Sequence, residues 1–159
     1  LTLINGQIAF PATQVASAGA NTLDDYEEGT WTPVIGGSGG TSGQTYSLQM
    51  GRYVKIGKLV FWQCAVQLTA KGTITSAVQI QGLPFTSENT TNLYGFANVN
   101  YWDNLGVAWT FLAMTMDPNG TAATFNGTTA AATATSSLTT TDITNATTFI
   151  IAGQYRATA

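Results

Sequence analysis

Lys58-Leu59-Val60-Phe61-Trp62-Gln63-Cys64-Ala65-Val66-Gln67-Leu68-Thr69 alternates at a period of two residues. The even-numbered positions from Val60 to Leu68 are all apolar, whereas the odd-numbered positions mix apolar side chains with glutamine. Because successive side chains of a strand point to opposite faces, the segment predicts a long central strand with one face in a core. Leu59 and Phe61 make the other face too apolar to be only solvated. Both faces of this strand are therefore expected to contact protein.

Shorter strands are expected on both sides of this segment. They are separated by turn signals such as Asn5-Gly6, Ala70-Lys71-Gly72 and Asp117-Pro118-Asn119-Gly120. The expected strands cover residues 30–35, 53–56, 74–80, 93–102, 107–116 and 148–155. The glycines of 36–43 favour a flexible loop, and 121–146 is expected to hold short strands and a long loop. Many short strands with regular turns predict an all-β antiparallel β-sandwich or jelly roll.

The N-terminal part differs from the rest in composition. Residues 12–22 are small and lack a usable period, which indicates an extended arm. We therefore divide the chain into an arm, 1–29, that links to an upstream shaft, and a distal β-sandwich domain, 30–159. The first residue, Leu1, is not methionine, so an upstream part is expected.

Composition restricts the classes of partner. Only 8% of the residues are charged, against roughly 25% in ordinary globular proteins. The formal net charge is −3, and no basic patch is present to neutralise a phosphate backbone, so nucleic-acid binding is not expected. The apolar runs are far shorter than the ~20 residues of a membrane span, so membrane insertion is not expected either.

No catalytic or metal-binding pattern is recognisable. The chain has no histidine, which is the commonest general base and metal ligand. Glu88, Asp103, Asp117 and Asp142 lie in expected turns, where such residues are common without any catalytic role. We expect no enzymatic activity, no cofactor and no metal site. The acidic cluster 24–28 lacks the spacing of a calcium loop and is expected to contact Arg52, Lys55 and Lys58.

Two features indicate self-association. The single cysteine, Cys64, falls on the apolar face of the central strand, so no disulfide within the chain stabilises the fold. The segments 59–68 and 107–116 are apolar on both faces, although an outer strand of a sandwich needs only one apolar face. The surplus apolar area predicts an obligate homotrimer.

Several motifs resemble a known group of proteins. Phe10-Pro11-Ala12-Thr13-Gln14-Val15 precedes Asn21-Thr22-Leu23-Asp24-Asp25-Tyr26-Glu27-Glu28-Gly29-Thr30-Trp31-Thr32-Pro33, and Gly51-Arg52-Tyr53-Val54-Lys55-Ile56-Gly57 and Gly82-Leu83-Pro84-Phe85-Thr86-Ser87 follow. Together they resemble the C-terminal region of tail fibres and tailspikes of tailed bacteriophages and prophages. The resemblance covers most of 8–87. It implies a homotrimeric virion appendage, attached to tail or head, whose distal domain faces the host surface.

Two functions are compatible with this resemblance. One is a receptor-binding module that recognises a host-surface glycan or protein, and the other is a purely structural module that trimerises and caps the fibre. Tyr94, Tyr101, Trp102 and Asp103 lie beyond the part of the chain that carries the resemblance. They combine aromatic rings with a carboxylate near a strand end, which is typical of a sugar-binding surface. Trp102 also fits a simpler role, in which it closes the end of the sandwich.

Overall fold

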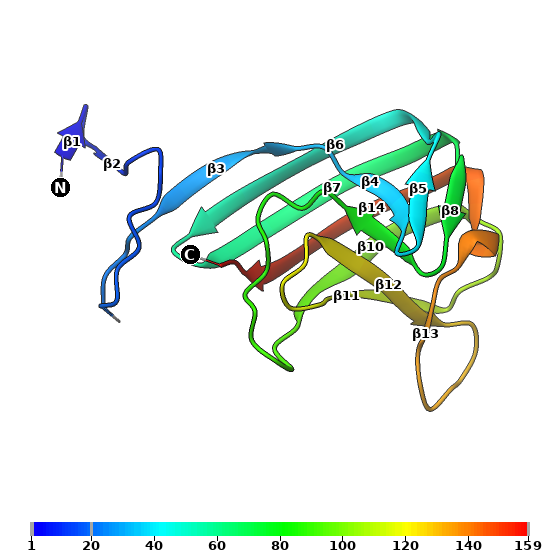
Figure 1. Cartoon of the computed structure of the whole chain (residues 1–159). Helices are drawn as coiled ribbons and strands as arrows, with labels where there is room; N and C mark the ends of the chain where they lie inside the picture. The colour runs from blue at the N-terminus through cyan, green and yellow to red at the C-terminus, as the bar shows by residue number, and fades with distance from the viewer. Residues whose placement is uncertain (1, 20, 159) are drawn as a thin grey trace.

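The computed structural model of the chain describes residues 2–19 and 21–158. One antiparallel sheet of ten strands dominates it (Figure 1). The strand order is β3-β6-β7-β14-β10-β11-β12-β9-β4, with β13 paired to β12, and two small sheets, β1-β2 and β5-β8, complete the fold. The elements are β1 Thr2–Ile4, β2 Gln7–Ala9, β3 Tyr26–Trp31, β4 Val34–Gly37, β5 Gly40–Ser42, β6 Thr45–Ile56, β7 Leu59–Ala70, β8 Thr73–Thr75, β9 Val78–Gln81, β10 Gly95–Leu105, β11 Phe111–Met116, β12 Ala122–Thr128, β13 Ser136–Ser137, the 3-10 helix η1 Thr140–Asp142 and β14 Ile143–Arg156.

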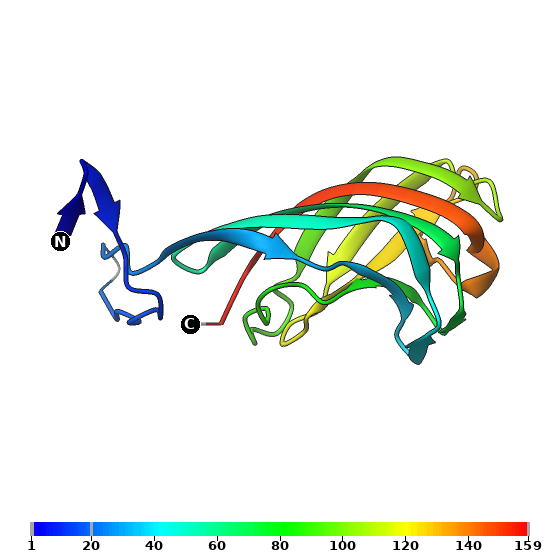
Figure 2. The same ribbon diagram turned by 90° about the horizontal axis from the view of Figure 1, so that it is seen from above.

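The main sheet curls so that one of its faces encloses the core (Figures 1 and 2). Phe125 of β12 and Phe149 of β14 come from strands that are not neighbours, yet their ring centroids are 4.4 Å apart. The amide of Ile35 in β4 donates a hydrogen bond of 2.9 Å to the hydroxyl of Tyr46 in β6. The all-β antiparallel class is therefore confirmed, and the two layers around the core are parts of one continuous curled sheet.

The predicted central strand is confirmed as β7, which pairs with β6 on one side and β14 on the other. The positive φ of 56° at Gly57 allows the tight turn between β6 and β7. The even-numbered side chains of β7 point into the core, where Val60 and Val66 are fully buried and Cys64 is 4% exposed. Alternation along one segment was thus sufficient to identify the inner face.

Several expectations about local structure are wrong. The strands expected over 30–35 and 74–80 are each divided in two, the first between β3 and β4 and the second between β8 and β9. The glycine-rich segment 36–43 is not a flexible loop, because Gly36 and Gly37 belong to β4 and Gly40 begins β5. A side chain at Gly37 would place its Cβ 2.1 Å from the backbone oxygen of Thr75, so the glycine serves a close approach of two strands. The strand expected from residue 107 begins only at Phe111.

The arm meets the body near the predicted domain boundary. The boundary between residues 29 and 30 falls inside β3, which pairs with β6 from Tyr26 to Trp31. The extended part of the arm therefore ends before Tyr26. At the other end of the arm, β1 and β2 form a hairpin around Asn5 and Gly6 that stands apart from the main sheet (Figures 1 and 2).

A buried ion pair fixes the arm to the body. Lys55 of β6 is 2% exposed and pairs with Asp25, so the expected contact between the acidic cluster and a cation is confirmed for this residue. The Lys55 ammonium also donates a hydrogen bond of 3.0 Å to Gln14 Oε1 in the arm. The same expectation is wrong for Lys58, which pairs with Glu88 at 3.5 Å.

Candidate functional site

The side of the main sheet that faces away from the core is unusually apolar, and we call it the outer face. We define it by outward side chains of four adjacent strands, β6, β7, β14 and β10. They are Met50, Arg52, Val54 and Ile56 of β6, Phe61, Gln63, Ala65 and Gln67 of β7, Thr148, Ile150, Ala152 and Gln154 of β14, and Phe96, Asn98, Tyr101 and Asp103 of β10.

Strand register places the large apolar side chains of the outer face in rows. One row crosses the sheet as Met50, Ala65, Ile150 and Tyr101. Its three large members are 55%, 43% and 48% exposed, respectively. A sheet face that only meets water normally carries polar side chains, so this row indicates a contact surface.

A second row runs parallel to the first across the same strands. It reads Val54, Phe61, Gln154 and Phe96, and the two phenylalanines are 43% and 53% exposed. Between the two rows lies a more polar one, Arg52, Gln63, Ala152 and Asn98. Apolar strips with a polar row between them resemble the core of an interface more than a water-exposed sheet.

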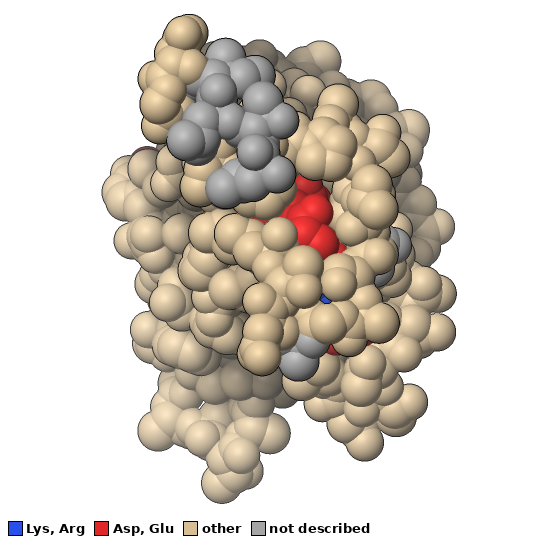
Figure 3. Space-filling view, turned by 90° about the vertical axis from the view of Figure 1, so that its left-hand side faces the viewer, with Lys and Arg blue, Asp and Glu red and all other residues tan. Residues whose placement is uncertain are grey.

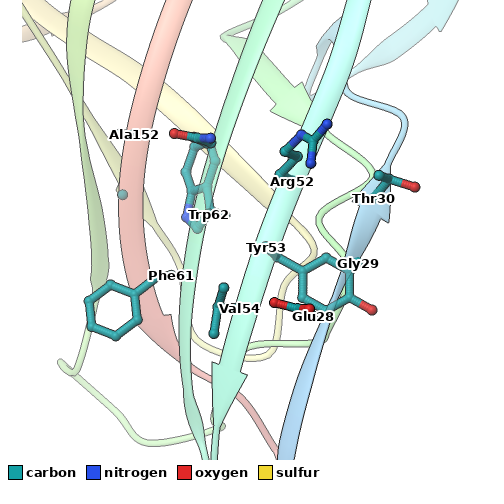
Figure 4. Close-up of a pocket in the computed structure, with 11 residues that line it drawn as sticks. Glu28, Gly29, Thr30, Arg52, Tyr53, Val54, Phe61, Trp62 and Ala152 are labelled. Carbon is teal, nitrogen blue, oxygen red and sulfur yellow. The ribbon is translucent and has the colours of Figure 1, made fainter.

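The outer face is hollowed beside β3. A groove of about 660 Å³ is lined by side chains of Glu28, Thr30, Arg52, Phe61 and Gln63 among others. Figure 4 shows Arg52 and Val54 on β6, next to Phe61 on β7, with Glu28 and Thr30 on the neighbouring strand. A smaller groove of about 250 Å³ lies beside Met50 and Ile150. These hollows allow side chains of another molecule to enter the face.

Charge is scarce on the described surface. Figure 3 looks at the end where the arm lies and shows acidic atoms in one small area, with almost no other charge in view. The carboxylate of Glu28 raises the pKa of the Tyr26 phenol and accepts a hydrogen bond of 3.3 Å from it. The hydrogen bond from Arg156 lowers the pKa of Glu88. Both groups therefore keep their ordinary charge at neutral pH.

The predicted ligand residues do not all share one surface. A bulge between Val99 and Tyr101 turns Tyr101 outward, where it opposes Ile150, while Trp102 points inward and packs against the core. Asp103 lies on the outer face two residues from Tyr101 and accepts a hydrogen bond of 2.8 Å from the amide of Asn104. The structure thus brings Tyr101 and Asp103 together on the outer face, whereas Trp102 packs against the core.

Tyr94 lies away from the other three predicted residues. It precedes β10, seven residues before Tyr101, which corresponds to roughly 20 Å of extended strand. It lines a separate groove of about 280 Å³ with Leu93 and Phe96. A single sugar-binding surface therefore does not include Tyr94.

The four turn carboxylates do not form one metal-binding cluster in the part of the chain that the structure describes. Asp142 is buried and accepts hydrogen bonds from the indole of Trp109 at 2.9 Å and from the amide of Thr139 at 2.7 Å. Glu88 is engaged by Lys58 and Arg156. Within 2–19 and 21–158, no group of three or more metal-binding side chains occurs, and no helix has the length and apolarity to cross a membrane.

Sequence reasoning found part of the outer face and missed the rest. Phe61 was recognised because it breaks the polar alternation of its strand. Met50, Phe96 and Ile150 were missed because they come from three different strands, whose order in the sheet cannot be read from local alternation. Only the register, which joins strands far apart in the sequence, places these residues in rows.

Comparison with known proteins supports the fold. The chain matches no protein-family model and no curated protein. A similar solved structure is the crystal structure of the Dettilon tailspike protein (gp208), with a TM-score of 0.66 and 14% sequence identity. The likeness covers 84% of this chain and 24% of the tailspike chain, so the chain spans about a quarter of that protein's length. The chain therefore has a fold that also occurs in a phage tailspike.

Proposed function

We propose that this chain is a non-enzymatic assembly module of a phage virion appendage, a tail fibre or a tailspike, and that three copies associate through the outer face. The observation that carries the proposal is the pair of exposed apolar rows across β6, β7, β14 and β10. The tailspike-like fold supports the assignment to an appendage. The location that follows is the virion, outside the cell and at the host surface.

The composition of the outer face supports a protein partner. Protein interfaces are enriched in aromatic residues, methionine and arginine and depleted in lysine and glutamate. The residues that define the outer face include Phe61, Phe96, Tyr101, Met50 and Arg52 but no lysine or glutamate, and Glu28 of β3 borders them. A homotrimer places this surface against copies of itself.

The magnitude of the apolar area supports the same conclusion. Covering a half-exposed large apolar side chain contributes roughly 0.8–1.5 kcal/mol. Five such side chains, Met50, Phe61, Phe96, Tyr101 and Ile150, contribute on the order of 4–8 kcal/mol in each protomer. This is comparable with the free-energy cost of bringing copies together, which is about 4–15 kcal/mol. Burial of the outer face therefore offsets a large part of this cost.

Sedimentation analysis of the purified chain tests the proposal. The wild type is expected to sediment as a trimer at micromolar concentration. Phe61→Glu and Ile150→Glu place a charge in the apolar rows and are expected to give folded monomers. Thr73→Glu, at an exposed position of β8, is the matched control and is expected to remain trimeric. A folded wild-type monomer at these concentrations would refute the proposal.

A second candidate function is recognition of a host-surface glycan. The observation in its favour is that Tyr101 and Asp103 offer an exposed ring and a carboxylate on the same face near the end of β10. A glycan array with wild type and Tyr101→Ala, combined with sedimentation of both, separates the two functions. Loss of glycan binding by a variant that keeps its oligomeric state favours recognition, whereas loss of the oligomer alone favours assembly.

A further inference from the structure

Two of the residues that define the outer face carry a charge, and they come from its two outermost strands, β6 and β10. Arg156, the next outward residue of β14, lies on the same side of the sheet, where it pairs with Glu88 at 2.9 Å. Arg52 is on β6, beside Met50, and Asp103 is on β10, beside Tyr101. The apolar row from Met50 to Tyr101 runs between them across β7 and β14. The outer face therefore has a positive side and a negative side, separated by an apolar strip.

Neither charge is matched within the described part of the protomer. The ion pairs there join Lys55 to Asp25, and Lys58 and Arg156 to Glu88. The guanidinium of Arg52 has no hydrogen bond among these residues, although its backbone oxygen accepts one from Trp31. The carboxylate of Asp103 receives hydrogen bonds from Asn104 alone, at 2.8 and 3.0 Å.

Arg52 and Asp103 are too far apart to meet within one protomer. Three strand spacings separate β6 from β10, and Asp103 opposes Thr148, four residues along β14 from the row of Arg52. With about 4.8 Å between strands and about 3.3 Å per residue, the two positions are roughly 20 Å apart. Any direct contact between these side chains therefore joins two molecules.

Covering the outer face favours such a contact. A charge that loses water without gaining a counter-charge is strongly unfavourable, whereas an arginine–carboxylate pair can form two parallel hydrogen bonds. Arg52 also lines both the large and the small groove of the outer face, so a side chain of another molecule can reach it.

We infer that, in the assembled module, Arg52 of each copy pairs with Asp103 of the neighbouring copy. The inference rests on the proposed assembly through the outer face and adds its register. The positive side of one face meets the negative side of the next, so the contact is head to tail. Head-to-tail contacts close into a ring when the rotation between neighbours allows it, which is the geometry that a trimer needs.

Charge exchange tests the pairing. Arg52→Asp and Asp103→Arg each place like charges together in every contact, and each is expected to weaken trimer formation at least tenfold in sedimentation equilibrium. The double variant Arg52→Asp/Asp103→Arg restores opposite charges and is expected to recover most of the trimer. Asp117→Arg, in the turn between β11 and β12, makes the same charge change away from the outer face and is expected to have no effect.

The outcomes separate this inference from the proposed function. If the wild type is trimeric and Phe61→Glu dissociates it, but the double variant stays dissociated, the pairing is refuted and the assembly stands. Glu28 lines the same groove as Arg52 and is the alternative partner. If Glu28→Arg restores the trimer of the Arg52→Asp variant and Asp103→Arg does not, the pairing is also refuted. A monomeric wild type refutes the assembly and the pairing together.

Discussion

Lys55 is the most deeply buried charge among the described residues, and its surroundings explain why it is tolerated. Its ammonium pairs with Asp25, which is 5% exposed, and lies 5.3 Å from the centre of the Phe85 ring. Gln14 accepts a further hydrogen bond from it. The ammonium therefore exchanges water for a counter-charge, an amide oxygen and an aromatic face.

Replacing Lys55 alone should be costly. Lys55→Met leaves the Asp25 carboxylate buried without its partner, and we expect the free energy of unfolding to fall by about 3–5 kcal/mol. Urea unfolding at pH 7 measures this loss. The double variant Lys55→Met/Asp25→Leu should recover most of it, because no buried charge remains.

Lys58→Met is the matched control, because its side chain is 39% exposed and its partner is Glu88. Removing this surface pair should cost less than about 1 kcal/mol. Equal losses for Lys55→Met and Lys58→Met would show that burial of the Lys55 pair has no energetic consequence.

Cys64 and Tyr53 should make the fold sensitive to alkali. Burial raises the pKa of the Cys64 thiol to about 12. Burial, followed by the hydrogen bond to Glu27, raises the pKa of Tyr53 to about 12. In the unfolded chain these groups lose their protons near their ordinary values of 9.0 and 10.0. The stability that they contribute is present below pH 9 and is lost as the pH rises towards 12.

Urea midpoints measured from pH 8 to pH 11 should therefore fall above pH 9, and Cys64→Val should reduce the slope. A thiol reagent at pH 8 should label Cys64 only after unfolding. Rapid labelling of the native chain would contradict the burial of this side chain.

At the scale of single elements, alternation predicted the long strands, and close packing explains the errors. Gly36, Gly37 and Gly40 indicate flexibility by composition, yet they occur where β4 and β5 approach neighbouring strands. Glycine serves both purposes, and sequence alone does not separate them. Trp102 was misplaced because a single extra residue in β10 reverses the facing of every later side chain.

The arm provides a prediction about elements. Deleting 1–22 removes the Gln14 contact with Lys55 but leaves β3 paired with β6. We expect the shortened chain to stay folded, with a loss of about 1–3 kcal/mol for the hydrogen bond to a charged group. Circular dichroism and urea unfolding measure both quantities.

Deleting 1–31 is the comparison, because it also removes β3 and Asp25. This variant should be much less stable, since β6 loses its neighbour and Lys55 loses its counter-charge. If the two deletions are equally stable, β3 contributes nothing to the body and the domain boundary lies after it.

At the scale of the whole molecule, sequence predicted surplus apolar area but not its arrangement. Leu59 and Phe61 showed that the second face of the central strand is apolar. Ile150 lies on a strand 80 or more residues further along the chain, and its alignment with Met50 depends on two strand pairings. Long-range register of this kind is not encoded in local periodicity, so the outer face emerged only from the structure.

Thermal stability should depend on protein concentration if copies associate through the outer face. Association stabilises the folded state by mass action, and a hundredfold rise in concentration contributes about 2.7 kcal/mol for each association step. A trimer has two such steps shared among three chains, which gives a rise in Tm of about 5 °C for a chain of this length. Calorimetry at two protein concentrations measures the change.

Ile150→Glu should unfold at a lower temperature that does not change with concentration, because its apolar row is interrupted by a charge. A wild-type Tm that stays constant over the same range would mean that the apolar rows remain exposed in the native state.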